Sequence, residues 1–332
     1  SEHTNYNMTN GGHLAISPDG KTVAFVATDT IGIDRIWVRP INAMTAIPLL
    51  GTEGAIYPFW SFDSRKIGFF AASKLKTIEA AGGPAMTVCD APDGRGGTWN
   101  QQGIILFAAG PNDPISKVAA AGGVATRLTE MDTTKHETSH RWPSFLPDGN
   151  HFLYTTQSLT GVASENDAIK IASLDSSVNK QLFLGTSNVI YASGHLLFVR
   201  QGTLMSQPFN LRTLELAGDA VPVAEQIIYA TAYSRGIFSA SQDGILVLQG
   251  GENQASRTAV FDLSGNRTHL LPDLNTRGAR FSPDNQRVAF YVIENQSRNG
   301  DVWVHELQRG TSTRLTFNPA LDISPCWSPG GD

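Results

Sequence analysis

The chain has 332 residues, of which 41% are hydrophobic and 17% charged, and its formal net charge is −5. This length supports a large core, and an acidic balance without clustered Lys and Arg argues against nucleic acid as a partner. No apolar run approaches the roughly 18 residues of a transmembrane helix, so no membrane span is expected in this chain.

A short apolar run ends in a Ser-Pro-Asp-Gly-like turn and continues into a second apolar run eight times, about 44 residues apart. The turns are Ser17-Pro18-Asp19-Gly20, Ser61-Phe62-Asp63-Ser64, Asn100-Gln101-Gln102-Gly103, Leu146-Pro147-Asp148-Gly149, Ala192-Ser193-Gly194, Ser241-Gln242-Asp243-Gly244, Ser282-Pro283-Asp284-Asn285 and Ser328-Pro329-Gly330-Gly331. Asp bonds its own backbone in such turns, and Gly accepts the positive φ that closes a hairpin. A period of this size is typical of propellers and solenoids.

Each repeat contains four strand-sized runs that are rich in β-branched and aromatic residues. In the first repeat they are residues 14–16, 22–26, 35–39 and 46–50, and in the last complete repeat 279–281, 287–291, 301–304 and 313–317. Four antiparallel strands make one blade, and a blade buries both faces only when blades stack in a ring. The sequence therefore predicts an all-β fold, a β-propeller of four-stranded antiparallel blades.

Seven complete repeats start near residues 11, 55, 96, 138, 188, 236 and 276, and a partial one covers 322–332. We predict a seven-bladed ring that forms one domain over residues 1–332. Residues 4–9 are interpreted as an outer strand without its own blade. The two cysteines, Cys89 and Cys326, are expected to be buried free thiols.

Several longer strings are more specific than the period. They are Ile36-Trp37-Val38-Arg39-Pro40-Ile41, Tyr57-Pro58-Phe59-Trp60-Ser61, Gly94-Arg95-Gly96-Gly97-Thr98-Trp99-Asn100, Ser139-His140-Arg141-Trp142-Pro143 and Arg309-Gly310-Thr311-Ser312-Thr313-Arg314-Leu315. In this order the chain resembles the TolB-like propeller region of bacterial receptor-type serine/threonine protein kinases. The resemblance implies a periplasmic or other extracytoplasmic location and a sensing or binding role, with a protein partner possible. The kinase motifs themselves are not in this sequence.

One stretch, His136-Glu137-Thr138-Ser139-His140, fits the H-E-x-x-H signature of zinc proteases. That signature needs a helix, and Pro143 close behind it, at the start of a predicted strand, disfavours one. We therefore predict no metal site here. Nor does the sequence show a nucleophile elbow, a phosphate-binding loop or a dinucleotide fingerprint, so no catalytic residue and no cofactor are predicted.

In a propeller the first strand of each blade lines the central channel, and the segments that enter these strands surround one mouth. The residues at this place are Tyr57, Trp99, His140, Arg141, Trp142, Arg235, Arg277 and Asp322. Aromatic faces stack on sugars or bases and Arg binds carboxylates, so this collar is predicted to bind a small molecule, glycan or peptide. Packing between blades for the Trp residues, and structural hydrogen bonding for His140 and Arg141, are the alternatives.

Three functions are compatible with these features. The first is a non-catalytic binding or sensor propeller, the extracytoplasmic part of a bacterial signalling protein. The second is a propeller-fold lyase or hydrolase acting on acidic glycans, with His140, Arg141, Tyr57 and Arg277 as its active residues. The third is the gating propeller of a prolyl-oligopeptidase-like enzyme. The absence of a recognisable catalytic motif in the sequence favours the first.

Overall fold

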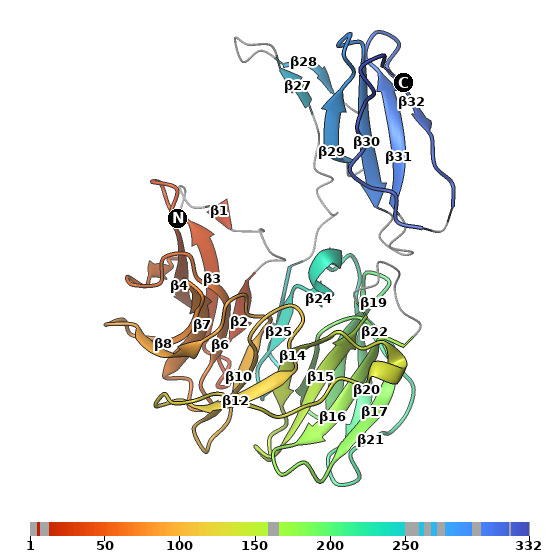
Figure 1. The fold of residues 1–332 in the computed structure, drawn as a ribbon. Helices are drawn as coiled ribbons and strands as arrows, with labels where there is room; N and C mark the ends of the chain where they lie inside the picture. The colour runs from red at the N-terminus through yellow and green to blue at the C-terminus, as the bar shows by residue number, and fades with distance from the viewer. Residues whose placement is uncertain are drawn as a thin grey trace. The chain divides into compact units, whose positions relative to one another are not determined.

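The computed structural model describes residues 5–6, 13–158, 166–249, 259–261, 267–270, 276–293, 300–318 and 320–331. The chain divides into two compact units, Ser1–Leu159 with Ser164–Gly250, and Thr160–Ala163 with Gly251–Asp332. Strands dominate both units (Figure 1). The predicted all-β fold is therefore confirmed, while one domain over residues 1–332 stays a prediction.

The first unit contains small antiparallel sheets that follow one another along the chain. The first repeat forms β1 (Asn5–Tyr6), β2 (Leu14–Ile16), β3 (Thr22–Thr28), β4 (Asp34–Pro40) and β5 (Ile47–Pro48). The second forms β6 (Ile56–Trp60), β7 (Lys66–Ala71), β8 (Lys74–Glu79) and β9 (Met86–Asp90). The third forms β10 (Gly97–Trp99), β11 (Ile104–Ala108), β12 (Ile115–Ala119) and β13 (Thr126–Arg127).

The later repeats of this unit follow the same order. A 3-10 turn, η2 (Thr133–Lys135), leads into β14 (Ser139–Phe145), β15 (His151–Gln157), β16 (Ala168–Ser173) and β17 (Asn179–Leu184). The fifth repeat forms β18 (Val189–Ala192), β19 (His195–Arg200), β20 (Thr203–Asn210), β21 (Glu215–Leu216) and β22 (Val221–Ala224). The sixth contributes β23 (Tyr229–Ala230), η3 (Thr231–Tyr233), β24 (Arg235–Gly236), β25 (Phe238–Ala240) and β26 (Leu246–Leu248).

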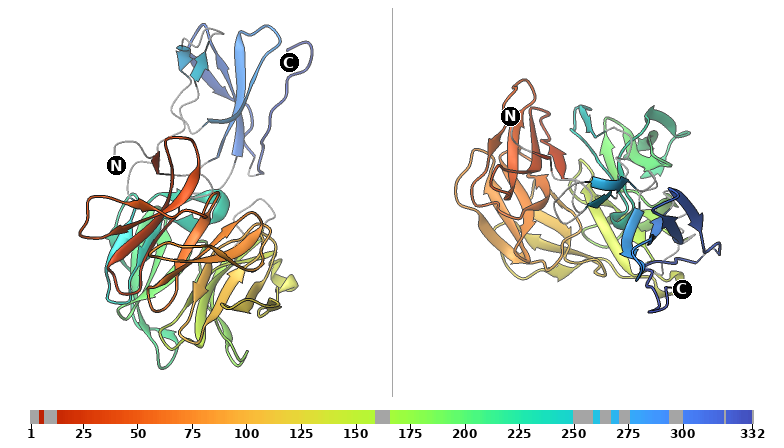
Figure 2. Two further views of the ribbon diagram at one scale, coloured as in Figure 1. Left: turned by 90° about the vertical axis from the view of Figure 1, so that its left-hand side faces the viewer. Right: turned by 90° about the horizontal axis from the view of Figure 1, so that it is seen from above.

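The innermost strands of the first unit contact one another in the order β2, β6, β10, β14, β18 and β25, and β25 contacts β2. Six repeats therefore close a ring within this unit, and the views in Figure 2 show their sheets around a common centre. The predicted count of seven blades is not confirmed, because the seventh repeat belongs to the second unit.

The turn after an innermost strand owes its geometry to one serine and one aspartate. Ser17 Oγ donates to Asp19 Oδ1 over 2.6 Å, and the backbone N–H of Lys21 donates to the same oxygen. Thr22 N–H in turn donates to Ser17 Oγ. The same pattern recurs at Ser61 and Ser282. This confirms the predicted role of the aspartate in closing the hairpin.

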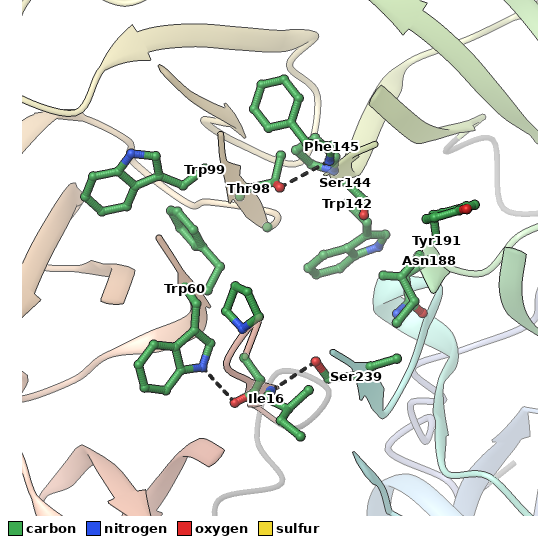
Figure 3. A pocket seen from close by; sticks show the side chains of 18 of the residues that line it. Ile16, Trp60, Thr98, Trp99, Trp142, Ser144, Phe145, Asn188, Tyr191 and Ser239 are labelled. Carbon is green, nitrogen blue, oxygen red and sulfur yellow. Dashed lines mark hydrogen bonds between the residues drawn. The ribbon is translucent and has the colours of Figure 1, made fainter. Parts of the chain in front are cut away.

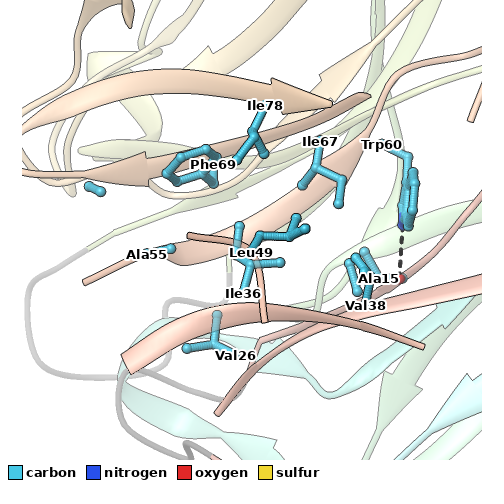
Figure 4. Packing of buried hydrophobic residues seen from close by; sticks show 12 residues of the cluster. Ala15, Val26, Ile36, Val38, Leu49, Ala55, Trp60, Ile67, Phe69 and Ile78 are labelled. Atoms are coloured by element: carbon cyan, nitrogen blue, oxygen red, sulfur yellow. Dashed lines mark hydrogen bonds between the residues drawn. The ribbon is translucent and has the colours of Figure 1, made fainter. Parts of the chain in front are cut away.

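Neighbouring blades bury apolar side chains against each other. Between the first and second blades, Val26 and Ile36 of one sheet pack with Ile67 and Phe69 of the next (Figure 4). The Trp60 indole donates to the Ala15 carbonyl of the preceding blade over 3.0 Å. Burying a Val, Ile or Phe side chain contributes about 1.5–3 kcal/mol. Packing of apolar side chains between blades, and not hydrogen bonding alone, therefore holds the ring together.

Among the described residues, two hydrogen bonds join the sixth repeat to the first where the ring closes. Ile16 N–H donates to Ser239 Oγ over 3.1 Å, and Gln242 N–H donates to the Pro18 carbonyl over 3.2 Å. Both bonds join an innermost strand or its turn to the corresponding element of the other repeat. This closure involves no strand shared between repeats in the part of the chain that the structure describes.

The second unit contains a hairpin, β27 (Ala259–Phe261) with β28 (Arg267–Leu270), and one complete blade. The blade consists of β29 (Thr276–Phe281), β30 (Arg287–Ile293), β31 (Gly300–Glu306) and β32 (Thr311–Arg314). The Trp327 indole donates to the Arg280 carbonyl over 2.9 Å, as Trp60 does to Ala15. The partial eighth repeat therefore packs on the seventh in the manner of the second on the first.

Three smaller expectations need revision. Of residues 4–9, the described pair forms β1, which joins β3 on the same edge as β2, so it belongs to the first blade rather than outside it. Cys89 is half-buried and Cys326 is exposed; both thiols are free, but neither is fully buried. The predicted fourth strand of the first repeat shrinks to Ile47–Pro48.

Candidate functional site

A pocket of about 240 Å³ lies where the six innermost strands of the first unit meet (Figure 3). Each of these strands or its flanking turn contributes to the lining, as expected for a propeller channel. The lining includes Ile16, Tyr57, Trp60, Thr98, Trp99, Trp142, Phe145, Asn188, Tyr191, Arg235 and Ser239. Among the described lining residues, Arg235 is the one that carries a charge.

The two ends of this channel differ in exposure. Where the innermost strands begin, the lining side chains are buried, with Tyr57 1%, Trp142 6% and Arg235 7% exposed. Where the strands end in their turns, Gln101 and Pro147 are exposed, and Phe62 is 38% exposed. We call the first the sealed end and the second the open end. The predicted mouth was placed at the sealed end, and ligand entry at that end stays a prediction.

Two bulky residues with left-handed backbone close the sealed end. Tyr57 has φ 49° and Trp142 φ 54°, and each lies at a register shift of its strand, in β6 and in β14. Such bulges redirect a side chain, and a positive φ is costly for a non-glycine residue. The two rings meet edge to face with centroids 4.9 Å apart. The bulges thus turn both rings onto the channel axis.

Arg235 lies against both rings. Its guanidinium carbon is 5.2 Å from the Tyr57 ring centroid and 5.2 Å from that of Trp142. Stacking of a cation on two aromatic faces holds the planar group in place. The Trp142 indole N–H donates to the Tyr233 carbonyl over 3.0 Å, which fixes the second ring. Burial raises the pKa of Tyr57 well above its usual range, so its phenol stays protonated.

Side chains of one blade satisfy backbone groups of the next along the channel wall. Phe145 N–H donates to Thr98 Oγ1 over 3.2 Å, and Tyr57 N–H donates to His13 Nδ1 over 3.1 Å. Together with the bond from Ile16 to Ser239, these contacts use donors on the innermost strand edges, which would otherwise face the pocket. Since His13 Nδ1 accepts a bond, its ring proton is placed on Nε2.

His140 and Arg141 do not line the pocket. His140 is fully buried, with its Nδ1 2.7 Å from Thr129 Oγ1 and its Nε2 3.1 Å from Glu137 Oε2. Lys170 Nζ pairs with the other oxygen of Glu137. Arg141 is 2% exposed, and its Nε donates to Ser139 Oγ. Ligand binding by these two residues stays a prediction, and their observed contacts match the structural alternative.

Glu137, which the sequence places in the H-E-x-x-H stretch, is buried and bonded to His140, Lys170 and the Asp132 N–H. Burial by itself would raise the pKa of Glu137, but hydrogen bonds from His140, Lys170 and the Asp132 N–H lower it to about 2. His136 has a left-handed backbone and β14 starts at Ser139, so the H-E-x-x-H stretch is not helical, as expected. The described residues contain no cluster of three or more potential metal ligands.

The structure brings four of the eight predicted collar residues to the pocket, namely Tyr57, Trp99, Trp142 and Arg235. Arg277 and Asp322 belong to the second unit, and the Arg277 side chain lies outside the described part of the structure. Asp322 is half-buried and accepts a bond from Asn318. Thr98, Asn188 and Ser239 were not predicted; the signal that marks them is their position in an innermost strand or, for Asn188, directly before one.

No helix in the described residues has the length and apolar character needed to cross a membrane. No model of a known protein family matches the chain. The fold and the central pocket define a β-propeller. Comparison with known sequences and structures shows which propellers it resembles.

A stretch of 53 residues is 42% identical to the Tol-Pal system protein TolB of Anaeromyxobacter dehalogenans, covering 16% of this chain and 12% of that protein. A stretch of 130 residues is 27% identical to the same protein of Coxiella burnetii, covering 38% of this chain and 29% of that one. The matched parts are therefore under a third of the length of these relatives.

Two solved structures resemble the chain with a TM-score of 0.50. One is TolB from Acinetobacter baumannii, 12% identical over 64% of this chain and 54% of that one. The other is a functionally unknown protein from Desulfotomaculum acetoxidans, 15% identical over 78% of this chain and 84% of that one. These likenesses support a TolB-like β-propeller fold.

Proposed function

We propose that the chain is a non-catalytic, protein-binding propeller outside the cytoplasm, part of a bacterial signalling protein, that receives a segment of its partner at the open end of the channel. The observation that carries this proposal is the pocket itself. Six strands from six repeats converge on it, its walls are largely aromatic and aliphatic, and it is closed at one end. Concave, mostly apolar sites with a few polar groups are typical of binding.

The size of the pocket indicates the kind of ligand. A volume of about 240 Å³ equals the share of about eight water molecules in the liquid, at roughly 30 Å³ each. This suits one or two side chains of an inserted protein segment better than several sugar rings. Partner segments of this kind deliver a few anchoring side chains, while the surrounding rim contributes complementarity.

The likenesses to TolB support a protein partner and an extracytoplasmic location. Both matched relatives are proteins of the Tol-Pal system, and the resemblance to the extracytoplasmic part of receptor-type kinases points to the same side of the membrane. The signalling context rests on that resemblance alone.

The contacts of His140 favour the binding function over the glycan-cleaving one. An acid or base must reach the substrate, whereas His140 is fully buried between Thr129 and Glu137. A gating propeller needs a hydrolase domain as its partner, and no observation on the described residues favours this function.

The proposal is tested by selecting linear peptides that bind the purified chain, followed by affinity measurement against variants. Ser144 lines the pocket and is half-exposed, so Ser144→Trp fills the pocket with an indole. We expect this variant to lose at least about tenfold in affinity, equal to 1.4 kcal/mol. Isothermal titration calorimetry with the selected peptides gives the dissociation constants.

The matched control is Thr213→Trp, which adds the same side chain at an exposed turn of the fifth repeat. Its affinity for the peptides should equal that of the wild type. Equal affinities for wild type and Ser144→Trp, with both proteins folded by circular dichroism, would place the binding site elsewhere.

A further inference from the structure

The geometry points to proline as the residue that the partner segment inserts into the pocket, bound through its ring and through the backbone carbonyl groups beside it. This inference rests on the proposed function and adds the chemical class of the anchoring residue. It follows from three hydrogen-bond donors in the lining, from the scarcity of acceptors beside them and from the aromatic walls.

Three side chains of the lining each accept a hydrogen bond from a backbone N–H of the next repeat around the ring. They are Thr98 Oγ1 with Phe145 at 3.2 Å, Asn188 Oδ1 with Gly236 at 2.8 Å, and Ser239 Oγ with Ile16 at 3.1 Å. Each side chain is thereby held by an oxygen atom between two blades. A group that is already fixed loses little conformational freedom when a ligand binds.

The same three side chains keep a hydrogen-bond donor. A serine or threonine hydroxyl whose oxygen accepts a bond still carries its O–H, and an asparagine held by Oδ1 still carries its NH₂. Among the described residues, Thr98 Oγ1, Ser239 Oγ and Asn188 Nδ2 donate no hydrogen bond. Figure 3 shows all three around the pocket. The pocket therefore offers donors from three different blades to a ligand that brings acceptors.

Acceptors are scarce beside these donors. The described lining contains no Asp or Glu. Among its other amides, Asn100 donates to the Gly149 carbonyl and accepts two backbone N–H groups, while Gln101 and Gln242 are exposed in turns at the open end. Apart from hydroxyl groups, which donate or accept, little in these side chains can receive an N–H from a ligand. A buried N–H without an acceptor is costly, so the pocket favours a ligand that has none.

Proline has this combination of properties. It lacks a backbone N–H, keeps its carbonyl as an acceptor and has an apolar ring with a fixed φ. The aromatic lining, which includes Trp60, Trp99, Trp142 and Phe145, suits that ring. Segments rich in proline bind aromatic-lined sites in this way, because their extended conformation is formed before binding and little entropy is lost.

The test compares three capped peptides on the wild-type protein. They are acetyl-Pro-Pro-Pro-NH₂, acetyl-Ala-Ala-Ala-NH₂ and the N-methylglycine peptide acetyl-Sar-Sar-Sar-NH₂, which lacks both the ring and the backbone N–H groups. Dissociation constants come from NMR titrations that follow the indole N–H signals of the protein. We expect the proline peptide to bind at least about tenfold more tightly than the alanine peptide, with the N-methylglycine peptide between them.

One variant reverses the hydrogen-bonding character of the pocket. Asn188→Asp keeps an oxygen for the Gly236 N–H but replaces the donor by an acceptor. We expect the preference for proline over alanine to fall below about threefold, since the new acceptor receives the alanine N–H groups. The matched control is Asn210→Asp, at an exposed turn outside the lining, where Oδ1 also accepts a backbone N–H. This control should retain the wild-type preference.

Equal binding of the proline and alanine peptides by the wild type overturns the assignment of proline, and so does the failure of all three peptides to bind. An N-methylglycine peptide no tighter than the alanine peptide, or an unchanged preference in folded Asn188→Asp, overturns its hydrogen-bonding basis. None of these results touches the proposed function, because peptide selection and the Ser144→Trp variant test the pocket without reference to proline.

Discussion

The sealed and open ends of the channel are built from the same six strands, yet they differ in side-chain exposure and in backbone geometry. At the open end the strands pass into regular turns, and the lining is half-exposed. At the sealed end two bulges turn Tyr57 and Trp142 onto the axis, and Arg235 fills the space between them. The repeated strands therefore form the channel, and local departures from the repeat close it at the sealed end.

The largest expected effect comes from removing the Trp142 side chain at the sealed end. We expect Trp142→Ala to lower the free energy of unfolding by about 3–5 kcal/mol, as for other buried large-to-small replacements. Because φ is 54° at this position, Trp142→Gly should be about 1 kcal/mol more stable than Trp142→Ala. Urea denaturation followed by circular dichroism measures both values.

Trp37 in β4 provides the control for this comparison. It is buried in a regular strand, where Gly is less stable than Ala by about 0.5–1 kcal/mol. The order of the Ala and Gly variants should therefore be reversed at Trp37. The same order at both positions would show that the left-handed backbone of Trp142 is not responsible.

The next effect concerns the buried charges beside the sealed end. Lys170→Met leaves the Glu137 carboxylate buried without its cation, and we expect a loss of about 3 kcal/mol in the free energy of unfolding at pH 7. The Glu137→Gln/Lys170→Met double variant removes both charges and should recover part of this loss. A double variant less stable than Lys170→Met would contradict the pairing.

The stabilisation from Glu137 should also depend on pH. The folded pKa is lowered to about 2 from an unfolded value near 4.5, so the contribution is complete above the unfolded pKa and is lost as the pH falls from about 4.5 towards 2. The difference in unfolding free energy between wild type and Glu137→Gln should therefore shrink across this window. A difference that stays constant between pH 6 and pH 3 would mean that the carboxylate is not stabilised by the fold.

The smallest expected effect is a difference in stability between variants of two pocket tryptophans, Trp60 and Trp99. Trp60→Phe removes the donor to the Ala15 carbonyl, and we expect a loss of about 1–2 kcal/mol in the free energy of unfolding. In Trp99, half-exposed at the pocket, the indole N–H has no acceptor among the described residues, so Trp99→Phe should change stability by less than about 0.5 kcal/mol. If chemical denaturation gave similar losses of stability for Trp60→Phe and Trp99→Phe, the two tryptophans would not differ in their contribution to the fold.

Local features of the fold were predictable because they depend on neighbours in the sequence. The Ser-x-Asp turn is closed by bonds within five residues, so the first and seventh repeats could be divided into strands. The turn of the fifth repeat departs from this pattern because Ser193 and Gly194 form a two-residue hairpin, with φ 47° and 87°, that needs no aspartate. A tight turn between the two strands is required here as in the other repeats, but Ser193 and Gly194 form it in place of serine and aspartate.

The site was less predictable because it depends on contacts between repeats. The periodicity placed Tyr57, Trp142 and Arg235 near one end of a channel, but it could not show that bulges would close that end. The same holds for the blade number, which is decided by where β25 meets β2. Glu137 was found within a motif, and its role follows from Lys170, 33 residues away.

The bond from Ile16 to Ser239 joins residues 223 positions apart. Contacts of such long separation fold slowly, since a large loop must be closed before they stabilise anything. The first repeats therefore leave the ribosome well before the strand that completes their ring. Until the sixth repeat emerges, the exposed flank of the first blade is open to wrong partners, and chaperone dependence of this protein should concentrate in that interval.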